Sequence, residues 1–529
     1  MFEVIIVGSG VSGVAAALRL VDNGIKPCII DVGMEPCPEP EISENFYTFR
    51  EKNDCFKLMI GEDFEGLYNL DRRNKPIPAK LTSPGMRFVL ERSKKLAPVN
   101  ESGFNVIQSF ARGGLANAWG AGLYRYNNRD LEGFPIRESD LNPYYERLTE
   151  EIGISGENDD LTPYFGRDDF LQMPLRLSAN ASRILKKYFR NRKKLNKKGI
   201  YVGRPRLGVL SEEKDGRKAC DYSNLEFWQP DLSYIYSPSL TLRKLIQEGK
   251  VVYIKGFMVK SWSRKDNVLN VQADTVKEKR TAFFECKKLV LAAGAVNSAK
   301  LALSTAKDYQ TKLTLLDNPA LQFPFVLPSR IGSILETDAF GLTQLNFIYD
   351  SKVYDLLLHG SILEVTSPAR AEFFAACPLA AFDNLRLIRT MLPALVVMQL
   401  FLPASREQGA LLSLDGNEEL KIIGKTNDIG KDLITDIIKI FRILGGYTLP
   451  SLVIKVPNGH GIHYAGTLPM SDSPKSEYTC SKFGELYGEP DVFVVDGSVF
   501  PALAAKNSSF SVMANAMRIA DFITNTLRG

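Results

Sequence analysis

A glycine-rich turn near the start of the chain has the residue types and spacing of a phosphate-binding site. The segment Gly8-Ser9-Gly10-Val11-Ser12-Gly13 follows an apolar, β-branched run, Phe2 to Val7, and precedes a helix-favouring stretch. A second apolar run ends on Asp31, roughly 20 residues further on, where an acidic side chain can accept a hydrogen bond from a ribose hydroxyl. This pattern predicts dinucleotide binding.

Each glycine of the turn is required by the local backbone geometry. Gly8 permits the tight turn out of the strand, Gly10 lets a pyrophosphate approach the backbone, and Gly13 lets the helix pack close to the strand. The free backbone N–H groups at the helix start, from Val11 and Ser12, are then expected to hold the phosphates.

The last 70 residues hold a second set of candidate groups. The chain has three histidines, and two of them, His460 and His463, lie three residues apart. An unperturbed histidine has a pKa near 6.5 and can accept a proton around neutral pH. A later apolar run ends on Asp496 at a Gly497 turn.

Asn507 and Ser508 lie at the predicted start of a long C-terminal helix. A helix start presents unpaired N–H groups and the positive end of the helix dipole, which stabilise negative charge. We therefore expect this helix start to face an anionic or developing negative group.

The elements that position these residues are those of a βαβ protein. Apolar runs predict parallel strands, and we expect residues 2–7, 289–293 and 492–496 to share one sheet. Shorter strands are predicted at 250–254, 258–262 and 268–273. Helices are predicted at 298–306 and, from an amphipathic pattern, at 428–444.

Composition excludes several classes of protein. Apolar residues make up 45% of 529 residues and the net charge is +5, so a disordered chain, a nucleic-acid-binding protein and a fibrous protein are not favoured. Seven scattered cysteines without a Cys-x-x-Cys pair suggest reduced thiols and no metal site. The basic run from Lys186 to Lys198 is interpreted as a solvated helix face, with an anionic-partner patch as the alternative.

Four separated segments resemble the glucose–methanol–choline (GMC) family of FAD-dependent oxidoreductases. They are the Gly8 turn with Asp31, the segment Arg112 to Gly120 with its Gly113-Gly114 pair, the segment Leu291 to Ser298, and the C-terminal set from His463 to Asn507. Their order is that of the family. Relatives usually have Glu where this chain has Asp31.

The resemblance implies a role for each site residue. His463 falls on the catalytic histidine and Asn507 on the second active-site position. Asp496 falls on the acid near the flavin diphosphate or ribityl chain. Gly497 and Ser508 should place backbone N–H groups near FAD. Further expected cofactor contacts are Gly113, Gly114, Asn117, Ala293 and Gly294.

Covalent flavin attachment in some relatives uses a histidine in the Gly-Gly loop. Here the alignment on Gly113, Gly114 and Trp119 puts Ala118 at that position, which implies non-covalent FAD. Trp119 is interpreted either as a core residue or as a flavin neighbour. His460 is interpreted as a substrate or supporting contact, and His359 as structural.

The fold implied is α/β, with a Rossmann-like FAD-binding domain and a discontinuous second α+β substrate domain containing an antiparallel sheet. We assign residues 1–149, 250–305 and 455–529 to the first domain, with an extended, loop-rich arm at 36–104. Residues 150–249 and 306–454 are assigned to the second.

The activity implied is oxidation of an alcohol CH–OH group, by proton abstraction and hydride transfer to flavin N5. A sugar or polyol is one candidate substrate, and an apolar or sterol-like alcohol is another. A redox-neutral lyase and a non-catalytic flavin-binding protein are the alternatives of other classes. The electron acceptor stays open between oxygen, a quinone and a protein.

The chain shows no basic leader and no apolar run of the roughly 20 residues that a membrane span needs. We therefore expect a cytoplasmic protein without a transmembrane segment, acting on a small molecule and not on nucleic acid.

Overall fold

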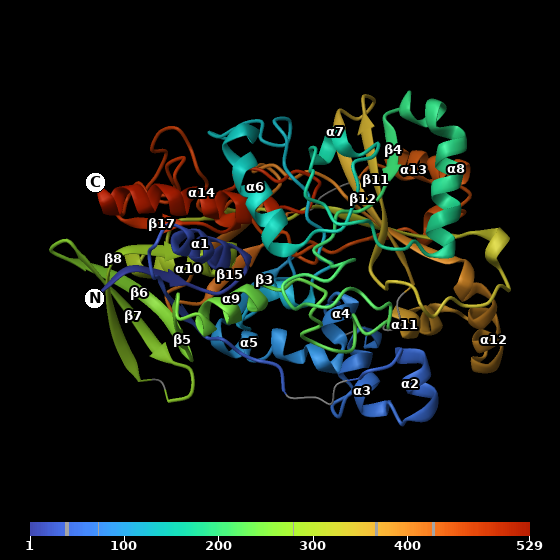
Figure 1. Cartoon of the computed structure of the whole chain (residues 1–529), viewed down its shortest axis with the longest axis horizontal. Coiled ribbons are helices and arrows are strands. Elements are labelled where there is room, and N and C mark those ends of the chain that lie inside the picture. Colours follow the sequence, from blue (N-terminus) through green and yellow to red (C-terminus); the bar gives the residue numbers. More distant parts are fainter. Residues whose placement is uncertain (38–41, 72–73, 279, 366–368, 426–428) are drawn as a thin grey trace.

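The computed structural model describes residues 1–37, 42–71, 74–278, 280–365, 369–425 and 429–529. These residues form an α/β protein with three sheets (Figure 1). The mixed architecture, including antiparallel sheets, confirms the predicted fold class.

The first sheet carries the glycine turn. Its order is β5-β2-β1-β8-β7-β6, with β17 paired to β8. Strands β1, β2, β5, β8 and β17 run parallel, and Val4, Ile5 and Ile6 of β1 are fully buried. Such apolar runs suit a parallel sheet that is covered on both faces. The bounds are β1 Phe2–Val7, β2 Cys28–Asp31, β5 Val252–Lys255, β6 Phe257–Lys265, β7 Val268–Thr275, β8 Thr281–Leu291 and β17 Val492–Val494.

The predicted sharing of one sheet by three distant segments is confirmed. Ile5 of β1 and Val492 of β17 both pair with Leu289 of β8. The strands end at Leu291 and Val494, two residues before the predicted ends, where the chain turns toward Ala293 and Asp496.

Helices from both ends of the chain cover this sheet. Helix α1 (Val11–Asp22) packs against α14 (Ser509–Arg528), and α14 packs against α6 (Glu138–Ile152). Helix α9 (Pro238–Gln247) packs against α1, and α10 (Gly294–Ala306) packs against β6.

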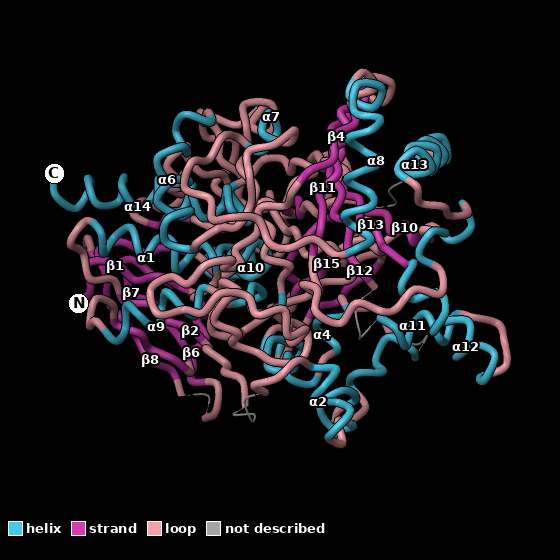
Figure 2. Tube along the Cα trace, turned by 45° about the vertical axis from the view of Figure 1, so that its right-hand side comes forward, coloured by secondary structure: helices cyan, strands magenta, loops and turns pink. Residues whose placement is uncertain are grey.

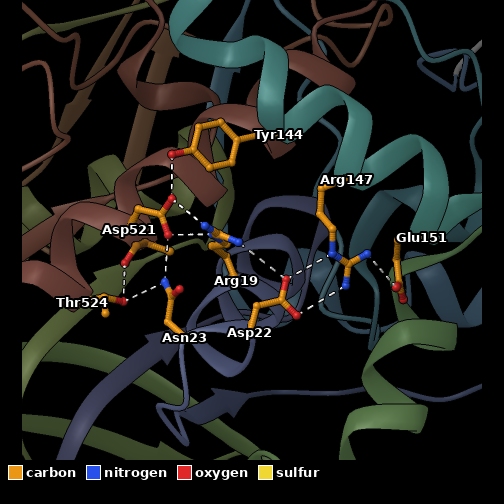
Figure 3. Close-up of polar contacts among 9 residues, drawn as sticks. Arg19, Asp22, Asn23, Tyr144, Arg147, Glu151, Asp521 and Thr524 are labelled. Carbon is orange, nitrogen blue, oxygen red and sulfur yellow. Dashed lines mark hydrogen bonds and ion pairs between the residues drawn. The ribbon is translucent and has the colours of Figure 1, made fainter. Parts of the chain in front are cut away.

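A polar network fastens α1 to α14 and α6 (Figure 3). Asp521 of α14 accepts from both Arg19 Nε, at 2.6 Å, and Arg19 Nη2, at 3.0 Å. Tyr144 of α6 and Asn23 donate to the same carboxylate, at 2.7 and 2.8 Å. A bidentate arginine–carboxylate pair of this kind is a strong hydrogen-bonding arrangement.

The second sheet is antiparallel, in the order β16-β10-β13-β12-β11-β4. One face packs on α8 (Ala179–Asn196) and α13 (Lys431–Leu444), which Figures 1 and 2 place beside it. Phe325 and Phe441 stack between sheet and helix at 4.0 Å. The strands are β4 Ile200–Gly203, β10 Ala320–Val326, β11 Thr343–Ser351, β12 Leu356–Glu364, β13 Leu395–Phe401 and β16 Ile454–Lys455.

The structure shows where the predicted amphipathic helix begins and where the basic run lies. The amphipathic helix predicted at 428–444 begins at Lys431, and residue 428 lies outside the described residues. The basic residues of the 186–198 run lie exposed along α8 and just after it, as expected for a solvated helix face. Short helices α7 (Thr162–Phe165), α11 (Ala369–Ala376) and α12 (Ala381–Met391) lie in the connections.

The third sheet joins the arm to the rest of the chain, in the order β3-β15-β14-β9. Its strands are β3 Val99–Ser102, β9 Leu313–Leu315, β14 Ala410–Leu414 and β15 Leu420–Ile423. The sheet thus pairs the predicted arm with residues assigned to the substrate domain. The division into two domains stays a prediction.

The arm at 36–104 is less extended than predicted. Its described residues form short helices, of which α3 ends at Gly61, with φ +82°. Residues 38–41 and 72–73 of the predicted arm lie outside the described residues. The helices are α2 Phe46–Lys52, α3 Phe56–Ile60, α4 Ala79–Thr82 and α5 Ser93–Leu96, with 3-10 turns at Glu65–Leu70 and Pro84–Val89.

Candidate active site

One large cavity, of about 1410 Å³, lies between the first sheet and the second. It is lined by the ends of the parallel strands, by both glycine loops and by the face of the second sheet that α8 and α13 leave free. A typical small-molecule pocket has roughly 300–1,000 Å³, so this cavity has room for a dinucleotide and a second small molecule.

The glycine turn is shaped as the sequence predicts. Gly8 has φ +99°, and a Cβ there would lie 2.7 Å from the carbonyl oxygen of Ala292. A Cβ on Gly13 would lie 2.1 Å from the oxygen of Gly8, so this glycine serves close packing and does not line the cavity. Gly10, Val11 and Ser12 do line it, at the start of α1. The helix start therefore faces the cavity with free N–H groups.

Asp31 lies buried at the end of β2 and borders the cavity. Ser9 Oγ and, at 3.1 Å, the Tyr253 hydroxyl donate to its Oδ2. Burial raises the pKa of Asp31 to about 6, although these two hydrogen bonds act in the opposite direction and lower it. Tyr253 was not predicted as a site residue, because it comes from the neighbouring strand β5 and no sequence spacing relates it to Asp31.

The Gly113-Gly114 loop lies against the first glycine turn. Gly113 N donates to Ser9 Oγ at 3.1 Å, and a Cβ on Gly114 would lie 3.5 Å from Gly10 Cα. Asn117, a predicted cofactor contact, does not line the cavity. Its Nδ2 donates to the carbonyls of Arg112 and Gly114, at 2.9 and 2.8 Å, so Asn117 holds the loop in shape.

Two residues of the loop after Gly114 face the cavity. Ala118 and Trp119 both line it. Trp119 also donates from Nε1 to the carbonyl of Tyr236 at 2.8 Å and packs against the apolar core. Trp119 is therefore a packed residue that also borders the cavity, and its place next to a flavin stays a prediction.

Asp496 joins two strand ends. Its Oδ2 accepts from Gly294 N at 2.9 Å and from Ser298 Oγ at 2.5 Å, and its Oδ1 accepts from Ser498 N at 2.9 Å. The buried carboxylate, whose pKa is raised by burial, thus fixes the loops after β8 and β17. Ala293, Gly294 and Gly497 border the cavity beside it.

His463 is held from two sides. Its backbone N donates to Asp317 Oδ1 at 3.2 Å, and its Nδ1 lies 3.0 Å from Asn318 Oδ1. The ring lies 4.8 Å from that of Phe401 at the end of β13. The ring also lines the cavity.

The Asn318 amide sets the tautomer of His463. Asn318 Nδ2 donates to the carbonyls of Leu402 and Ala504, at 2.7 and 2.9 Å. Its Oδ1 can then only accept, so Nδ1 of His463 carries the hydrogen and Nε2 is left as the proton acceptor. Burial lowers the pKa of His463 to about 4, below the ordinary value that the sequence suggested, so the ring is neutral at physiological pH.

Asn507 presents an unpaired group to the same cavity. Its Oδ1 is buried and, among the described residues, makes no hydrogen bond. Helix α14 begins at Ser509, and the N-cap, Ser508, makes no side-chain capping bond. Asn507 therefore lies before the cap and is free to bind a ligand.

Lys506 anchors this segment and was not predicted. Its buried ammonium pairs with Asp130 and donates to the carbonyls of Arg125 and Tyr164, at 2.9 and 2.6 Å. Neither Asp130 nor the two carbonyls lies near Lys506 in the sequence, so no motif could have indicated the contact.

The other two histidines differ in setting. His460 lines the cavity and its Nδ1 lies 3.1 Å from the Pro76 carbonyl of the arm. His359 is fully buried in β12, with Nε2 3.0 Å from Asn346 Nδ2, and does not line the cavity, which agrees with its structural interpretation.

Across the residues that the structure describes, no group of three or more His, Cys, Asp or Glu is placed to hold a metal ion. None of the helices in the described ranges has the length and apolar character of a membrane span.

Comparison with known proteins supports the resemblance drawn from the motifs. Residues 453–516, which include His463, Asp496 and Asn507, match the family model described as GMC oxidoreductase. The similarity to this family predicted from the sequence is therefore confirmed. A search of curated proteins gave no match.

Solved structures share the fold over the whole chain. Pyridoxine 4-oxidase from Mesorbium loti is 13% identical with a TM-score of 0.59, covering 99% of this chain and 99% of that chain. Formate oxidase from Aspergillus oryzae, in a structure concerned with FAD modification, is 13% identical with a TM-score of 0.61, covering 100% and 98%.

Proposed function

We propose that the protein binds FAD non-covalently and oxidises the CH–OH group of a small-molecule alcohol. One observation carries the proposal: the proton-accepting Nε2 side of His463 and the unpaired amide oxygen of Asn507 border the same cavity as two apposed glycine loops. The match of residues 453–516 to the GMC oxidoreductases supports an oxidoreductase.

The residues present fit FAD. Gly10 has open space where a Cβ would project, and the start of α1 offers N–H groups to a diphosphate. Asp31 is placed to accept from a ribose hydroxyl. Gly294, Gly497 and Ser508 border the same cavity. Ala118 has no nucleophile with which to attach the flavin. When bound, FAD supplies the redox step by accepting a hydride.

The protein's part is to position the alcohol and remove its proton. His463 Nε2 accepts the hydroxyl proton, with Nδ1–H held by Asn318 so that the ring does not turn. Asn507 holds the same hydroxyl without competing for the proton. The start of α14 stabilises negative charge that develops beside it.

The free face of the second sheet favours an apolar alcohol over a sugar. Pro324, Val326, Leu363, Leu395 and Val397 line the cavity there. Away from the few polar side chains of this face, a sugar would bury hydroxyls against these apolar residues without partners, at a cost of roughly 1–3 kcal/mol for each unpaired group.

The test is anaerobic bleaching of the flavin. Purified protein is mixed with a panel of long-chain, cyclic and sugar alcohols, and absorbance near 450 nm is followed before air is readmitted. Bleaching by long-chain or cyclic alcohols is expected. A flavin that no alcohol reduces would contradict the proposal and favour the lyase or the non-catalytic alternative. Reoxidation in air separates an oxidase from a dehydrogenase.

A further inference from the structure

A row of polar side chains crosses the apolar wall of the cavity. Gln322 of β10 pairs with Gln399 of β13, and Gln399 pairs with Ser361 of β12. All three line the cavity. Side chains directly opposite each other on one face of a sheet have Cβ atoms about 4.5–5.5 Å apart, so the three form one continuous polar row.

The direction of this row is set by the opposite face of the sheet. Leu321, Phe323, Met398 and Leu400 alternate with the polar residues and are fully buried against α8 and α13. Because successive side chains of a strand point to opposite faces, the core positions force Gln322 and Gln399 toward the cavity.

The row lies one strand step from Phe401, the neighbour of the catalytic histidine. Phe401, whose ring contacts His463, is two residues from Gln399 along β13. A step of two residues is about 7 Å. On the far side of the polar row follow Pro324, Val397 and Leu363, paired across the same strands, so that the wall becomes apolar again.

The two amides are without a protein partner. Within the described part of the chain, the side chains of Gln322 and Gln399 make no hydrogen bond, although both are half-buried. Ser361 Oγ receives a long contact of 3.4 Å from Asn346 Nδ2 and also bonds with the Tyr124 hydroxyl, so of the three residues it is the one with protein partners. Half-buried amides that do not bond to the protein are available to a ligand.

The row and its neighbours also exclude a charged ligand group. Neither the three polar residues nor the flanking Pro324, Val397, Leu363 and Phe401 carries a charge. A carboxylate or ammonium group placed there would be desolvated without an opposite charge, which is strongly unfavourable. A hydroxyl or a carbonyl matches amide and hydroxyl partners.

We infer that the substrate is an elongated, mostly apolar alcohol with a second, neutral hydrogen-bonding group, a hydroxyl or carbonyl, that binds Gln322, Gln399 and Ser361. An extended chain gains about 3.3–3.6 Å for every three bonds, so the 7 Å step from Phe401, beside His463, to the polar row spans about six bonds of the substrate. The inference rests on the proposed alcohol oxidation.

The experiment compares three ten-carbon alcohols: 1-decanol, decane-1,3-diol and decane-1,7-diol. The holoenzyme is expected to oxidise the 1,7-diol with kcat/KM about tenfold or more above the other two. The variants Gln322→Leu and Gln399→Leu keep the side-chain volume and lose the amide. In each variant, the ratio of kcat/KM for the 1,7-diol to kcat/KM for the other two alcohols is expected to fall toward one. The matched control is Gln408→Leu, in an exposed turn outside the cavity lining, which should keep the wild-type preference.

A binding measurement separates failure of this inference from failure of the proposed function. The dissociation constant of each alcohol is read from the perturbed flavin spectrum of His463→Ala holoenzyme, which lacks the proton acceptor. Tighter binding of the 1,7-diol, lost with Gln322→Leu, supports the polar row even where no alcohol is oxidised. Equal kcat/KM for all three alcohols, or Gln variants that keep the wild-type preference, would overturn the inference and leave alcohol oxidation standing.

Discussion

Asn318 Oδ1 lies 3.0 Å from Nδ1 of His463, and this contact determines which ring nitrogen can accept a proton. The amide cannot rotate, because its Nδ2 is already bonded to the carbonyls of Leu402 and Ala504. A base oriented in this way needs no rearrangement when the substrate binds.

Asn318→Leu should therefore lower the rate constant of flavin reduction about 10–100-fold, less than loss of the imidazole itself. Asn318→Asp should restore part of the rate, since a carboxylate still accepts from Nδ1–H. Its negative charge should also raise the pKa of His463 and move the acid limb of the pH profile upward. Unchanged profiles in both variants, measured by stopped-flow, would show that Asn318 is only a packing residue.

His463→Ala should keep FAD and the fold but lower flavin reduction about 10²–10⁴-fold, the contribution of a general base. His460→Ala is the matched control, because His460 also lines the cavity but its Nδ1 is engaged by the Pro76 carbonyl. It should cost much less. If His460→Ala slowed flavin reduction more than His463→Ala does, the assignment of His463 as the base would be wrong.

Flavin reduction should be independent of pH from about 5 to 8 and fall below about pH 4, where the buried His463 becomes protonated. Between the ordinary histidine value of about 6.5 and 4, the unfolded chain binds a proton that folded His463 does not. The contribution of His463 to folding stability is thus fully present above pH 6.5 and is lost as the pH falls through 4. Stopped-flow pH jumps test this, and a midpoint near 6.5 would contradict it.

Asn507→Ala should slow flavin reduction while changing the melting temperature by little. A side-chain N-cap contributes about 1 kcal/mol, but Asn507 precedes the cap and its Oδ1 has no partner among the described residues. Stopped-flow reduction and thermal unfolding of the same sample separate the two effects. Normal reduction kinetics with reduced stability would make Asn507 a structural residue.

The protein should purify yellow, and trichloroacetic acid should release the FAD into the supernatant. Ala118 lies at the attachment position on the cavity wall and offers no nucleophile. Flavin that stays on the precipitated protein, seen by its absorbance in the dissolved pellet, would refute non-covalent binding. An Ala118→His variant tests whether this position can reach the flavin.

The parts of the site that the sequence predicts are those formed by local geometry. The turn from Gly8 to Gly13 and the loop at Gly113 need left-handed or crowded backbone that glycine alone adopts easily, so their spacing is visible in one segment. The strands at 2–7 and 492–494 are recognisable because buried parallel strands are continuous apolar runs.

Residues that act through contacts between distant parts of the chain could not be recognised from the sequence. Asn318 meets His463 across 145 positions, and Lys506 meets Asp130 across most of the chain, through contacts that only the fold creates. The lowered pKa of His463 likewise follows from burial, which no motif records. Asn117 lies inside a motif but holds the loop and does not border the cavity, so its predicted contact with the cofactor stays a prediction.

The Arg19–Asp521 pair joins the first helix of the chain to the last one. During translation, α1 is made long before β17 and α14, against which β8 and α1 pack. At a translation rate of about 5–20 residues per second, the apolar face of α1 stays uncovered for roughly 25–100 s before α14 is made. Chaperones should therefore bind the nascent chain during that interval, and deletion of the segment that forms α14 should leave this face of α1 uncovered.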